Sequence, residues 1–402
     1  MRVAIIGGGA AGFFAALSAK DHHPGAEVTI YEKSDKLLSK VRISGGGRCN
    51  VTHHCTEPRK LAKHYPRGEQ FLRKAFERFA VRETISWFSE HNVELKTETD
   101  GRMFPTTDSS QTVVDVLQEG ARKRGVRIAL HCGAKAIERT SDGSLRLMIG
   151  AQDLRADRAI ITTGGHPSPT SYRWLAELGH TIVAPVPSLF TFNMPGEAIR
   201  DLMGVVVPAR VRIVGTEVES TGPVLITHWG LSGPAVLRAS AFGARSLHAL
   251  DYRFTVQVNW LEGLSEESVR KTFSDQADVL ARKIAANADP FHLPKRFWSY
   301  QLDRAGIPMD RPWGTIGKKE KNRLIDLLTN DRYQVSGKTT FKEEFVTAGG
   351  VALNEVDPIT MQSRSVPGLY FAGEVLDIDG ITGGFNFQAA WTTGFIAGKL
   401  EA

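Results

Sequence analysis

The sequence predicts an α/β protein in which both ends of the chain build one parallel-sheet domain around a long insertion. Three observations favour this fold. The chain opens with a strand, a glycine-rich turn, a helix and a second strand within residues 2–32. A strand and a closing helix return after residue 347, and the region between about 186 and 345 holds mostly short β-rich runs. At 402 residues the chain is long enough for two or three domains.

The hydrophobic pattern sets the expected elements in order. Near the two ends we expect strands at 2–6, 27–31, 127–131, 145–149, 158–162 and 368–372, and helices at 10–20, 110–124 and 388–400. In the insertion we expect strands at 205–214, 224–227 and 253–259, and helices at 265–286 and 318–328.

Composition excludes several protein classes. Three cysteines and no C-x-x-C pair argue against a disulfide framework and against disulfide-reductase chemistry. Cys49, His53, His54 and Cys55 lie close together, but no second ligand pair accompanies them, so we predict no metal. No run approaches the roughly 18 apolar residues of a membrane span, and the apolar start lacks a cleavage site. We therefore expect a soluble, cytoplasmic protein.

One segment, residues 56–82, is strongly basic and is called the basic segment below. Its eight cations stand against three carboxylates, in a chain of net charge +6. A solvated helix face is the more common explanation, and a nucleic-acid surface is the alternative. Four aromatic residues of the segment could stack on bases, although their helical spacing favours core packing: Tyr65, Phe71, Phe76 and Phe79.

The glycine-rich turn satisfies the G-x-G-x-x-G pattern of dinucleotide-binding folds. It follows a strand and begins a helix, and the next strand ends in an acidic residue, Glu32, as the pattern requires. Gly7 permits the tight turn, Gly9 lets the backbone approach a pyrophosphate, and Gly12 lets the helix pack closely on the strand. The phosphates would meet the N–H groups of Gly9, Ala10 and Ala11 at the positive end of the helix. Glu32 would accept hydrogen bonds from the ribose hydroxyls and disfavours a 2′-phosphate.

Two later segments favour FAD over NAD at this site. Residues 160–165 form a strand that ends in Thr162, Thr163 and Gly164, as in a second flavoprotein signature. Residues 369–377 read as a third signature, in which Gly373 approaches the cofactor and Glu374 or Asp377 binds the ribityl hydroxyls. The helix that follows Gly383 and Gly384 offers a further N-terminus near the isoalloxazine ring, where it would stabilise negative charge.

Five motifs together resemble the BaiN-like, aminoacetone-oxidase-type family of NAD(P)/FAD-dependent oxidoreductases. They are the runs S-G-G-G-R-C-N at 44–50, T-H-W-G-L-S-G-P-A at 227–235, T-A-G-G-V at 347–351, G-E-V-L-D at 373–377 and G-G-F-N at 383–386. The resemblance covers nearly the whole chain. It implies an FAD-binding Rossmann domain of the two-dinucleotide type (1–185 and 346–402), interrupted by a β-barrel-like domain (186–262 with about 330–345) and a small helical domain (263–329).

The resemblance also implies further cofactor contacts. Along the flavin it places Arg42, Ser44, Gly47, Arg48, Cys49 and Asn50, and near the adenine it places Ala134. With the signature residues, the expected contacts include Lys33, Phe385 and Asn386. A run of three glycines suits this role, because its amides can face an anion or a flavin edge.

The expected activity is an FAD-dependent oxidoreductase that passes hydride from transiently bound NAD(P)H through the flavin to an activated C=C bond. The positive charge and the basic segment favour a uridine of ribosomal RNA as the substrate, since some members of the resembling family appear to make dihydrouridine. A small-molecule enone reductase or amine oxidase is the alternative, and a non-enzymatic flavin redox sensor is a second. Cys49 and His228 are candidate proton donors, although a packing role for Cys49 and a structural role for His228 stay open.

Overall fold

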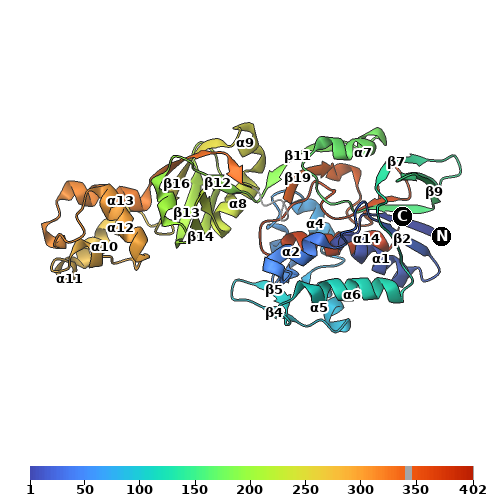
Figure 1. Ribbon diagram of the computed structural model, residues 1–402, viewed down its shortest axis with the longest axis horizontal. Helices are drawn as coiled ribbons and strands as arrows, with labels where there is room; N and C mark the ends of the chain where they lie inside the picture. The colour runs from blue at the N-terminus through green and yellow to red at the C-terminus, as the bar shows by residue number, and fades with distance from the viewer. Residues whose placement is uncertain (340–345, 402) are drawn as a thin grey trace. The chain divides into compact units, whose positions relative to one another are not determined.

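The structure is a computed structural model that describes residues 1–339 and 346–401 (Figure 1). Residues 340–345, the end of the predicted β-rich domain, lie outside the described residues. The chain forms two compact units. Unit 1 contains Met1–Ser188 and residues 346–401. Unit 2 contains residues 189–339.

A five-stranded, wholly parallel sheet forms the centre of unit 1. Its order is β20-β10-β1-β2-β6, and each neighbouring pair is parallel. The strands are β1 Arg2–Ile6, β2 Glu27–Tyr31, β6 Arg127–Ala129, β10 Arg158–Ile161 and β20 Leu369–Phe371. Continuous apolar runs suit this sheet, because both of its faces are covered: Ile5, Ile30 and Ile160 are fully buried.

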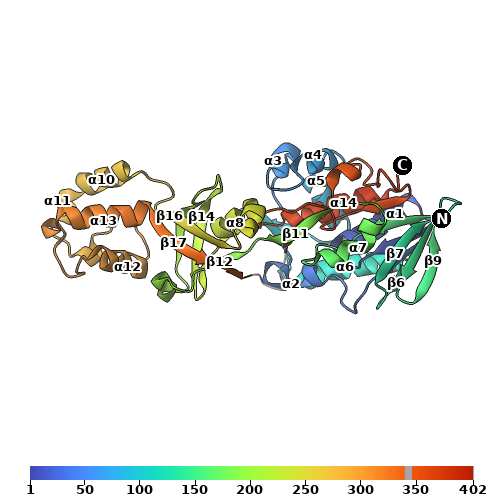
Figure 2. The same ribbon diagram turned by 90° about the horizontal axis from the view of Figure 1, so that it is seen from above.

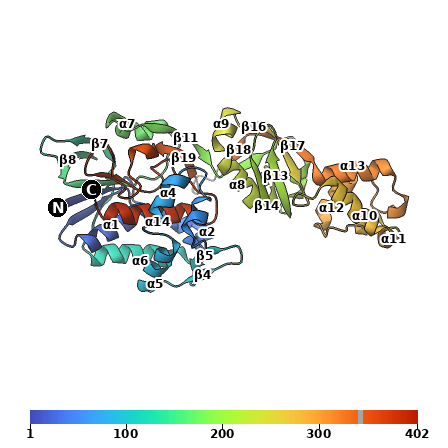
Figure 3. The same cartoon turned by 180° about the vertical axis from the view of Figure 1, so that it is seen from behind.

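Helices and small antiparallel sheets surround the parallel sheet. The helices are α1 Ala10–His22, α2 Ser39–Gly47, α3 Pro58–Ala62, α4 Glu69–Ala75, α5 Val81–Glu90, α6 Ser110–Lys123, α7 Arg173–Glu177 and α14 Phe385–Gly398. The short 3-10 helices of this unit are η1 Pro169–Tyr172 and η5 Leu353–Glu355. Figures 1 and 3 show α1 and α14 side by side, with α6 next to α1. A Cβ on Gly394 would lie 2.7 Å from the Ala11 carbonyl, so the two helices pack with little space between their backbones.

Three further sheets belong to unit 1. The sheets β3-β5-β4 and β7-β8-β9 have three strands each, and β11 pairs with β19. Their strands are β3 Thr52–His53, β4 Leu95–Thr97, β5 Arg102–Pro105, β7 Ala134–Arg139, β8 Leu145–Ile149, β9 Gln152–Ala156, β11 Ile182–Ser188 and β19 Val346–Val351. Ser188 pairs with Val346, so the insertion leaves and re-enters unit 1 at neighbouring positions.

Unit 2 is built on a seven-stranded sheet of order β17-β16-β13-β14-β15-β12-β18. The strands are β12 Thr191–Asn193, β13 Val206–Ile213, β14 Glu219–Thr227, β15 Gly230–Ser232, β16 Arg253–Asn259, β17 Asp331–Ser336 and β18 Lys338–Thr339. The first and last strands of this order, β17 and β18, are separated only by Gly337. The sheet therefore closes on itself and is barrel-like, and its interior holds a core that includes Phe192, Val211 and Val256.

The helices of unit 2 fall into two groups (Figures 1 and 2). Next to the sheet lie η2 Ala198–Leu202, α8 Pro234–Phe242 and α9 Ala244–Ala249. The second group has its own apolar core, which includes Trp298 and Trp313, and comprises α10 Glu266–Asp275, α11 Ala277–Leu280, η3 Ala285–Asn287, α12 Lys295–Ala305, η4 Trp313–Thr315 and α13 Lys318–Thr329. We call this second group the helical layer.

The predicted fold class is confirmed: a parallel Rossmann-like sheet is accompanied by a separate antiparallel, barrel-like sheet. The three-domain division of the chain stays a prediction. No helix among the described residues combines the length and apolar character that crossing a membrane requires.

The single helix predicted at 265–286 is wrong. Gln276 separates α10 from α11, and the chain after α11 instead pairs with a distant segment. Ala285 donates its N–H to the Arg311 carbonyl at 2.9 Å, and Ile284 forms a bridge with Pro312. These tertiary backbone hydrogen bonds outweigh the local helix propensity of the alanines.

Candidate cofactor site

The candidate site lies at the carboxyl edge of the parallel sheet. Because all five strands point the same way, the turns after β1, β2, β10 and β20 meet at one edge. This edge brings together Gly7, Glu32, Thr162 and Gly373, which the sequence placed in separate signatures. Gly373 lies against the first turn of α1, where its Cβ, if present, would be 3.0 Å from that of Ala11.

The three glycines of the first turn have different surroundings. A Cβ on Gly7 would lie 2.4 Å from the Thr162 carbonyl oxygen, and one on Gly12 would lie 2.0 Å from the Gly7 carbonyl oxygen. Both glycines are therefore required by close packing of strand, turn and helix. A Cβ on Gly9 would meet nothing within 4 Å, so the backbone there borders open space. Among the described residues no side chain caps the start of α1, which leaves its first N–H groups available to an anion.

Glu32 is held in place by backbone groups. One carboxylate oxygen accepts the Gly8 N–H at 2.8 Å, and the other accepts both the Ser34 N–H at 3.0 Å and the Ser34 hydroxyl at 2.9 Å. These bonds fix the carboxylate at the end of β2, beside the glycine turn. An oriented carboxylate in this position is what a ribose diol needs as a hydrogen-bond acceptor.

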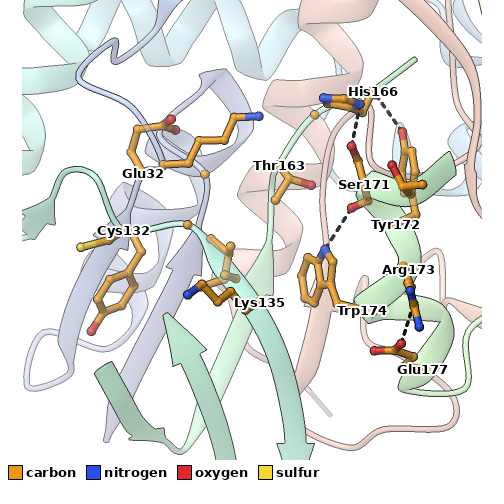
Figure 4. Close-up of a pocket in the computed structure, with 18 residues that line it drawn as sticks. Glu32, Cys132, Lys135, Thr163, His166, Ser171, Tyr172, Arg173, Trp174 and Glu177 are labelled. Atoms are coloured by element: carbon orange, nitrogen blue, oxygen red, sulfur yellow. Dashed lines mark hydrogen bonds and ion pairs between the residues drawn. The ribbon is translucent and has the colours of Figure 1, made fainter. Parts of the chain in front are cut away.

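A pocket of about 470 Å³ opens at this edge of the sheet. Its lining includes six predicted cofactor residues: Gly7, Glu32, Lys33, Ala134, Thr163 and Gly164. Figure 4 shows Glu32 and Cys132 on one side and Tyr172 and Trp174 on the other. The volume, the carboxylate and the aromatic wall fit the adenosine half of FAD.

The aromatic wall of the pocket is the part that sequence reasoning missed. Trp174 donates its indole N–H to the Ser171 carbonyl at 3.1 Å, and the Tyr172 hydroxyl accepts the His166 N–H at 2.9 Å. Ser171 also bonds the His166 ring at 2.7 Å. These residues lie on η1 and α7, directly after the second signature, and no glycine or charge pattern marks them. Only the aromatic pair in S-Y-R-W could have drawn notice.

The second and third signatures meet at Glu374. One carboxylate oxygen accepts the Thr347 N–H at 2.8 Å, and the other forms an ion pair with Lys40 at 2.7 Å. A Cβ on Gly165 would lie 2.6 Å from the first of these oxygens. Thr162 uses its hydroxyl to hold the Ile6 and Gly7 carbonyls, at 3.0 and 2.9 Å. Thr162 thus supports the glycine turn from within the protein.

The predicted flavin-side loops also come together. Asn50 lies beside Gly384: its amide group donates to the Thr52 carbonyl and accepts the Gly384 N–H, each at 3.0 Å. Gly384 has φ 92°, and a Cβ there would lie 2.6 Å from the Thr52 carbonyl, so glycine is required at the start of α14. Asn386 turns back to bond Gly380, accepting its N–H at 2.7 Å and donating to its carbonyl at 3.0 Å.

Two arginines of the predicted flavin loop have protein partners. Arg48 pairs with Glu98 at 2.6 Å and lies over the Phe104 ring, 4.0 Å from its centroid. The Glu98 carboxylate raises the pKa of Arg48. Arg42 donates to the Gln111 side chain at 2.7 Å. Ser44 and Gly47 belong to the break in α2, where Ser44 is extended and Gly45, Gly46 and Gly47 have left-handed φ values.

Cys49 is fully buried and has a left-handed backbone, with φ 61°. Burial raises the pKa of its thiol to about 12. Such a thiol lacks access to a substrate in this conformation, which favours the packing role. All three cysteines are free thiols.

His228 belongs to unit 2, on the exposed turn between β14 and β15. Its ring meets that of Trp229 edge to face, with centroids 4.1 Å apart. Its catalytic role stays a prediction. No group of three or more metal-ligating side chains occurs in the part of the chain that the structure describes.

The basic segment packs against the start of α14. His64 stacks on the Phe385 ring with centroids 4.3 Å apart, and His53 stacks on the same ring at 4.7 Å. The Tyr65 hydroxyl donates to the Phe385 carbonyl at 2.6 Å. The segment therefore borders the loop that the third signature and the G-G-F-N motif assign to the flavin.

The cations of the basic segment divide into two classes. Three have ion-pair partners: Arg67 pairs with the fully buried Asp379, Arg78 with Glu401 at 2.7 Å and the exposed Lys60 with Glu57 at 2.8 Å. Five others are exposed and form no ion pair among the described residues: Arg59, Lys63, Arg73, Lys74 and Arg82. The four aromatic residues are all buried, so stacking on bases by these rings is excluded and core packing explains them.

Comparison with protein families gives one match over almost the entire chain. Residues 1–400 match the family described as HI0933-like protein Rossmann domain. A 3-dehydro-bile acid delta(4,6)-reductase of Clostridium scindens is 29% identical, over 100% of this chain and 99% of that protein. A ribosomal RNA dihydrouridine synthase of Escherichia coli is 31% identical, over 97% of this chain and 95% of that protein.

Solved structures share the fold at low identity. A 3-ketosteroid-delta4-(5alpha)-dehydrogenase from Rhodococcus jostii has a TM-score of 0.50 and 13% identity, covering 98% of this chain and 96% of that one. The FrdA chain of E. coli quinol fumarate reductase has a TM-score of 0.51 and 13% identity, covering 99% of this chain and 69% of that one. At this identity the likeness concerns the fold.

Proposed function

We propose that this chain, which belongs to the HI0933-like Rossmann-domain family and is an FAD-dependent oxidoreductase, reduces a uridine of large-subunit ribosomal RNA to dihydrouridine. One hydride and one proton add across the C5=C6 bond of the base. NAD(P)H supplies the two electrons, and FAD transfers the hydride when bound. A ribosomal substrate places the enzyme in the cytoplasm.

The proposed FAD site extends along the carboxyl edge of the sheet. Glu32 and Trp174 would hold the adenosine half in the pocket between them, and Gly9 and the start of α1 would hold the pyrophosphate. Glu374 would bind the ribityl chain, and Asn50 and Gly384 would border the isoalloxazine ring. The remaining predicted contacts, including Arg42, Arg48 and Asp377, lie close in sequence to these residues. We propose that they also contact FAD.

One observation carries the choice of RNA: five exposed cations, which form no ion pair with any residue that the structure describes, belong to the segment that packs on Phe385, beside the proposed ring site. Phosphate groups on either side of a target base would contact such cations, and each contact adds affinity that falls with salt. A small apolar substrate gains nothing from them. The E. coli relative named as a ribosomal RNA dihydrouridine synthase supports the same choice.

The first test is genetic. Mass spectrometry of 23S-type ribosomal RNA from a strain that lacks the gene should show one uridine in place of dihydrouridine, and the wild-type gene should restore the modification. Unchanged dihydrouridine content in the deletion strain would refute the RNA substrate.

The second test uses paired variants of unit 1. The change Arg59→Glu/Lys63→Glu should weaken RNA binding about tenfold or more at 0.15 M salt and leave FAD content unchanged. The matched control is Arg2→Glu/Arg139→Glu, which alters the same charge at exposed positions of β1 and β7. Equal losses in both variants would contradict a role for the basic segment.

An enone reductase is the second candidate, favoured by the relative named as a 3-dehydro-bile acid delta(4,6)-reductase. It predicts rapid reoxidation of the reduced enzyme by a conjugated steroid ketone without RNA. Stopped-flow traces with the steroid and with an RNA fragment would decide between the two, because only the true substrate should reoxidise the flavin at a catalytic rate.

A further inference from the structure

The helical layer of unit 2 carries a second cluster of cations, which we call the basic tip. It consists of Arg282, Lys283, Lys318, Lys319 and Lys321. The first two follow α11, and the other three lie in the first turn of α13. Figure 2 shows α11 at the end of the helical layer that is farthest from the seven-stranded sheet.

Backbone pairing joins the first half of the basic tip to the segment that leads into α13. Trp313 donates its N–H to the Lys283 carbonyl at 2.9 Å, and Gly314 donates to the Ala281 carbonyl at 3.2 Å. Lys321 lies over the Trp313 ring, 5.4 Å from its centroid. Tertiary hydrogen bonds thus fix the first half of the tip, and the contact of Lys321 with the Trp313 ring brings the start of α13 close to it.

The charge of the basic tip is not cancelled by its neighbours. Arg282, Lys283, Lys318 and Lys319 are exposed and form no ion pair within the described parts of the chain. Glu320, the carboxylate closest in sequence, caps the Gly317 N–H at 2.8 Å and pairs with Arg311 at 2.7 Å. Asp275, Asp278 and Asp310 are the other exposed carboxylates close to the tip in sequence, so its five cations remain in excess.

We propose that the basic tip is a second phosphate-binding surface, which contacts phosphate groups of the RNA substrate. This inference rests on the proposed RNA substrate. A polyanion of fixed shape suits exposed cations on two adjoining segments, because each can contact a phosphate without induced folding. An anionic membrane suits them less, since α11 spans only Ala277–Leu280 and offers no amphipathic helix to insert.

The test is a charge reversal in the full-length FAD-loaded protein. Lys318→Glu/Lys319→Glu should fold normally, because carboxylates are favourable in the first turn of a helix. Binding to a ribosomal RNA fragment should weaken about tenfold or more at 0.15 M salt, and the slope of log affinity against log salt should become shallower by about two. Arg282→Glu/Lys283→Glu tests the other segment and should act in the same direction.

The matched control is Arg212→Glu/Arg332→Glu. Both residues are exposed on the seven-stranded sheet, where each is paired in register with Gln257. Equal losses in tip and control variants would reveal a general effect of net charge and overturn the proposal. It would also be overturned if both tip variants bound RNA with wild-type affinity and salt slope, or if they lost binding to phosphatidylglycerol vesicles while RNA binding was unchanged. A wild-type protein that neither binds nor modifies ribosomal RNA would instead refute the proposed function.

Discussion

At the residue scale, the fingerprint glycines separate folding from cofactor binding. Gly12→Val should lower the free energy of unfolding by about 3 kcal/mol or more, because its Cβ would overlap the Gly7 carbonyl oxygen. Gly9→Leu should cost no more than about 1 kcal/mol, since it faces open space and only worsens the N-cap. The affinity of the Gly9→Leu variant for FAD should nevertheless fall at least about 100-fold. Urea unfolding of the apoproteins and FAD titration measure the two effects, and an apo-Gly9→Leu protein as unstable as Gly12→Val would contradict this division.

The buried thiol of Cys49 makes a prediction about pH. Burial raises its pKa from the ordinary value of about 9 to about 12 in the folded protein. Below pH 9 the thiol is protonated in both states and its ionisation does not affect stability. Between pH 9 and 12 only the unfolded chain releases the proton, so stability should fall by about 1.4 kcal/mol per pH unit.

Cys49→Ala should remove this component of the pH dependence. The measurement is the difference in unfolding free energy between wild type and variant from pH 8 to 11, which isolates Cys49 from tyrosines that titrate in the same range. A constant difference over that range would show that Cys49 ionises normally in the folded protein.

The sequence predicts residues well where one backbone geometry demands one residue type. Gly7 and Gly12 are of this kind, and so is Glu32, which the turn spacing places at the end of the second strand. Trp174, in contrast, could not be predicted from a local backbone requirement. It lines the pocket only because η1 and α7 fold back over the sheet edge, and that tertiary arrangement leaves no local pattern.

At the element scale, one buried carboxylate connects the seven-stranded sheet to the helical layer. Asp331 begins β17 and accepts hydrogen bonds from Arg304 of α12 at 2.7 and 2.8 Å, from Trp260 at 3.0 Å and from Gln301 at 3.2 Å. Asp331→Ala should lower the unfolding free energy of unit 2 by about 3–5 kcal/mol, because it leaves a half-buried guanidinium without its counter-charge.

The double change Asp331→Leu/Arg304→Met is the control, since it removes both charges and fills the space with apolar groups. It should recover the part of the lost stability that comes from the unpaired guanidinium, whereas the Trp260 and Gln301 donors still lack their acceptor. Limited proteolysis within unit 2 reports the effect, and FAD absorbance reports whether unit 1 is intact. Equal proteolysis of Asp331→Ala and wild type would show that the network contributes little.

Elements whose hydrophobic period extends over one surface were predictable, and elements decided by distant pairing were not. The strands of the parallel sheet appear close to their expected positions because their apolar runs are buried on both faces. The predicted helix at 265–286 failed because residues after Leu280 find hydrogen-bond partners near Arg311, about 30 positions later. The last helix begins at Phe385 rather than 388, since Gly384 supplies the left-handed residue that starts it.

At the scale of the whole molecule, the order of predicted elements indicated an insertion, because the alternation of strands and helices stops near residue 186 and resumes near residue 347. Closure of the inserted sheet had no local signal. It depends on β17 and β18 lying at opposite ends of the strand order while only Gly337 separates them in the chain. Such a closure is visible only once the pairing of β12 with β18 is known.

The position of the insertion predicts that unit 1 can fold without unit 2. Ser188 at the end of β11 pairs directly with Val346 at the start of β19, so a two-residue Asn-Gly turn could join the two strands as a hairpin. Unit 1 keeps its parallel sheet, its helices and the whole proposed FAD path.

The shortened protein should therefore purify yellow and bind FAD within about tenfold of the full chain. It should bind ribosomal RNA more weakly, because the basic tip is absent while the basic segment remains. Absorbance at 450 nm and a cooperative thermal transition measure the first expectation, and filter binding measures the second. A colourless, unfolded product would show that unit 2 supplies part of the cofactor site or of the stability of unit 1.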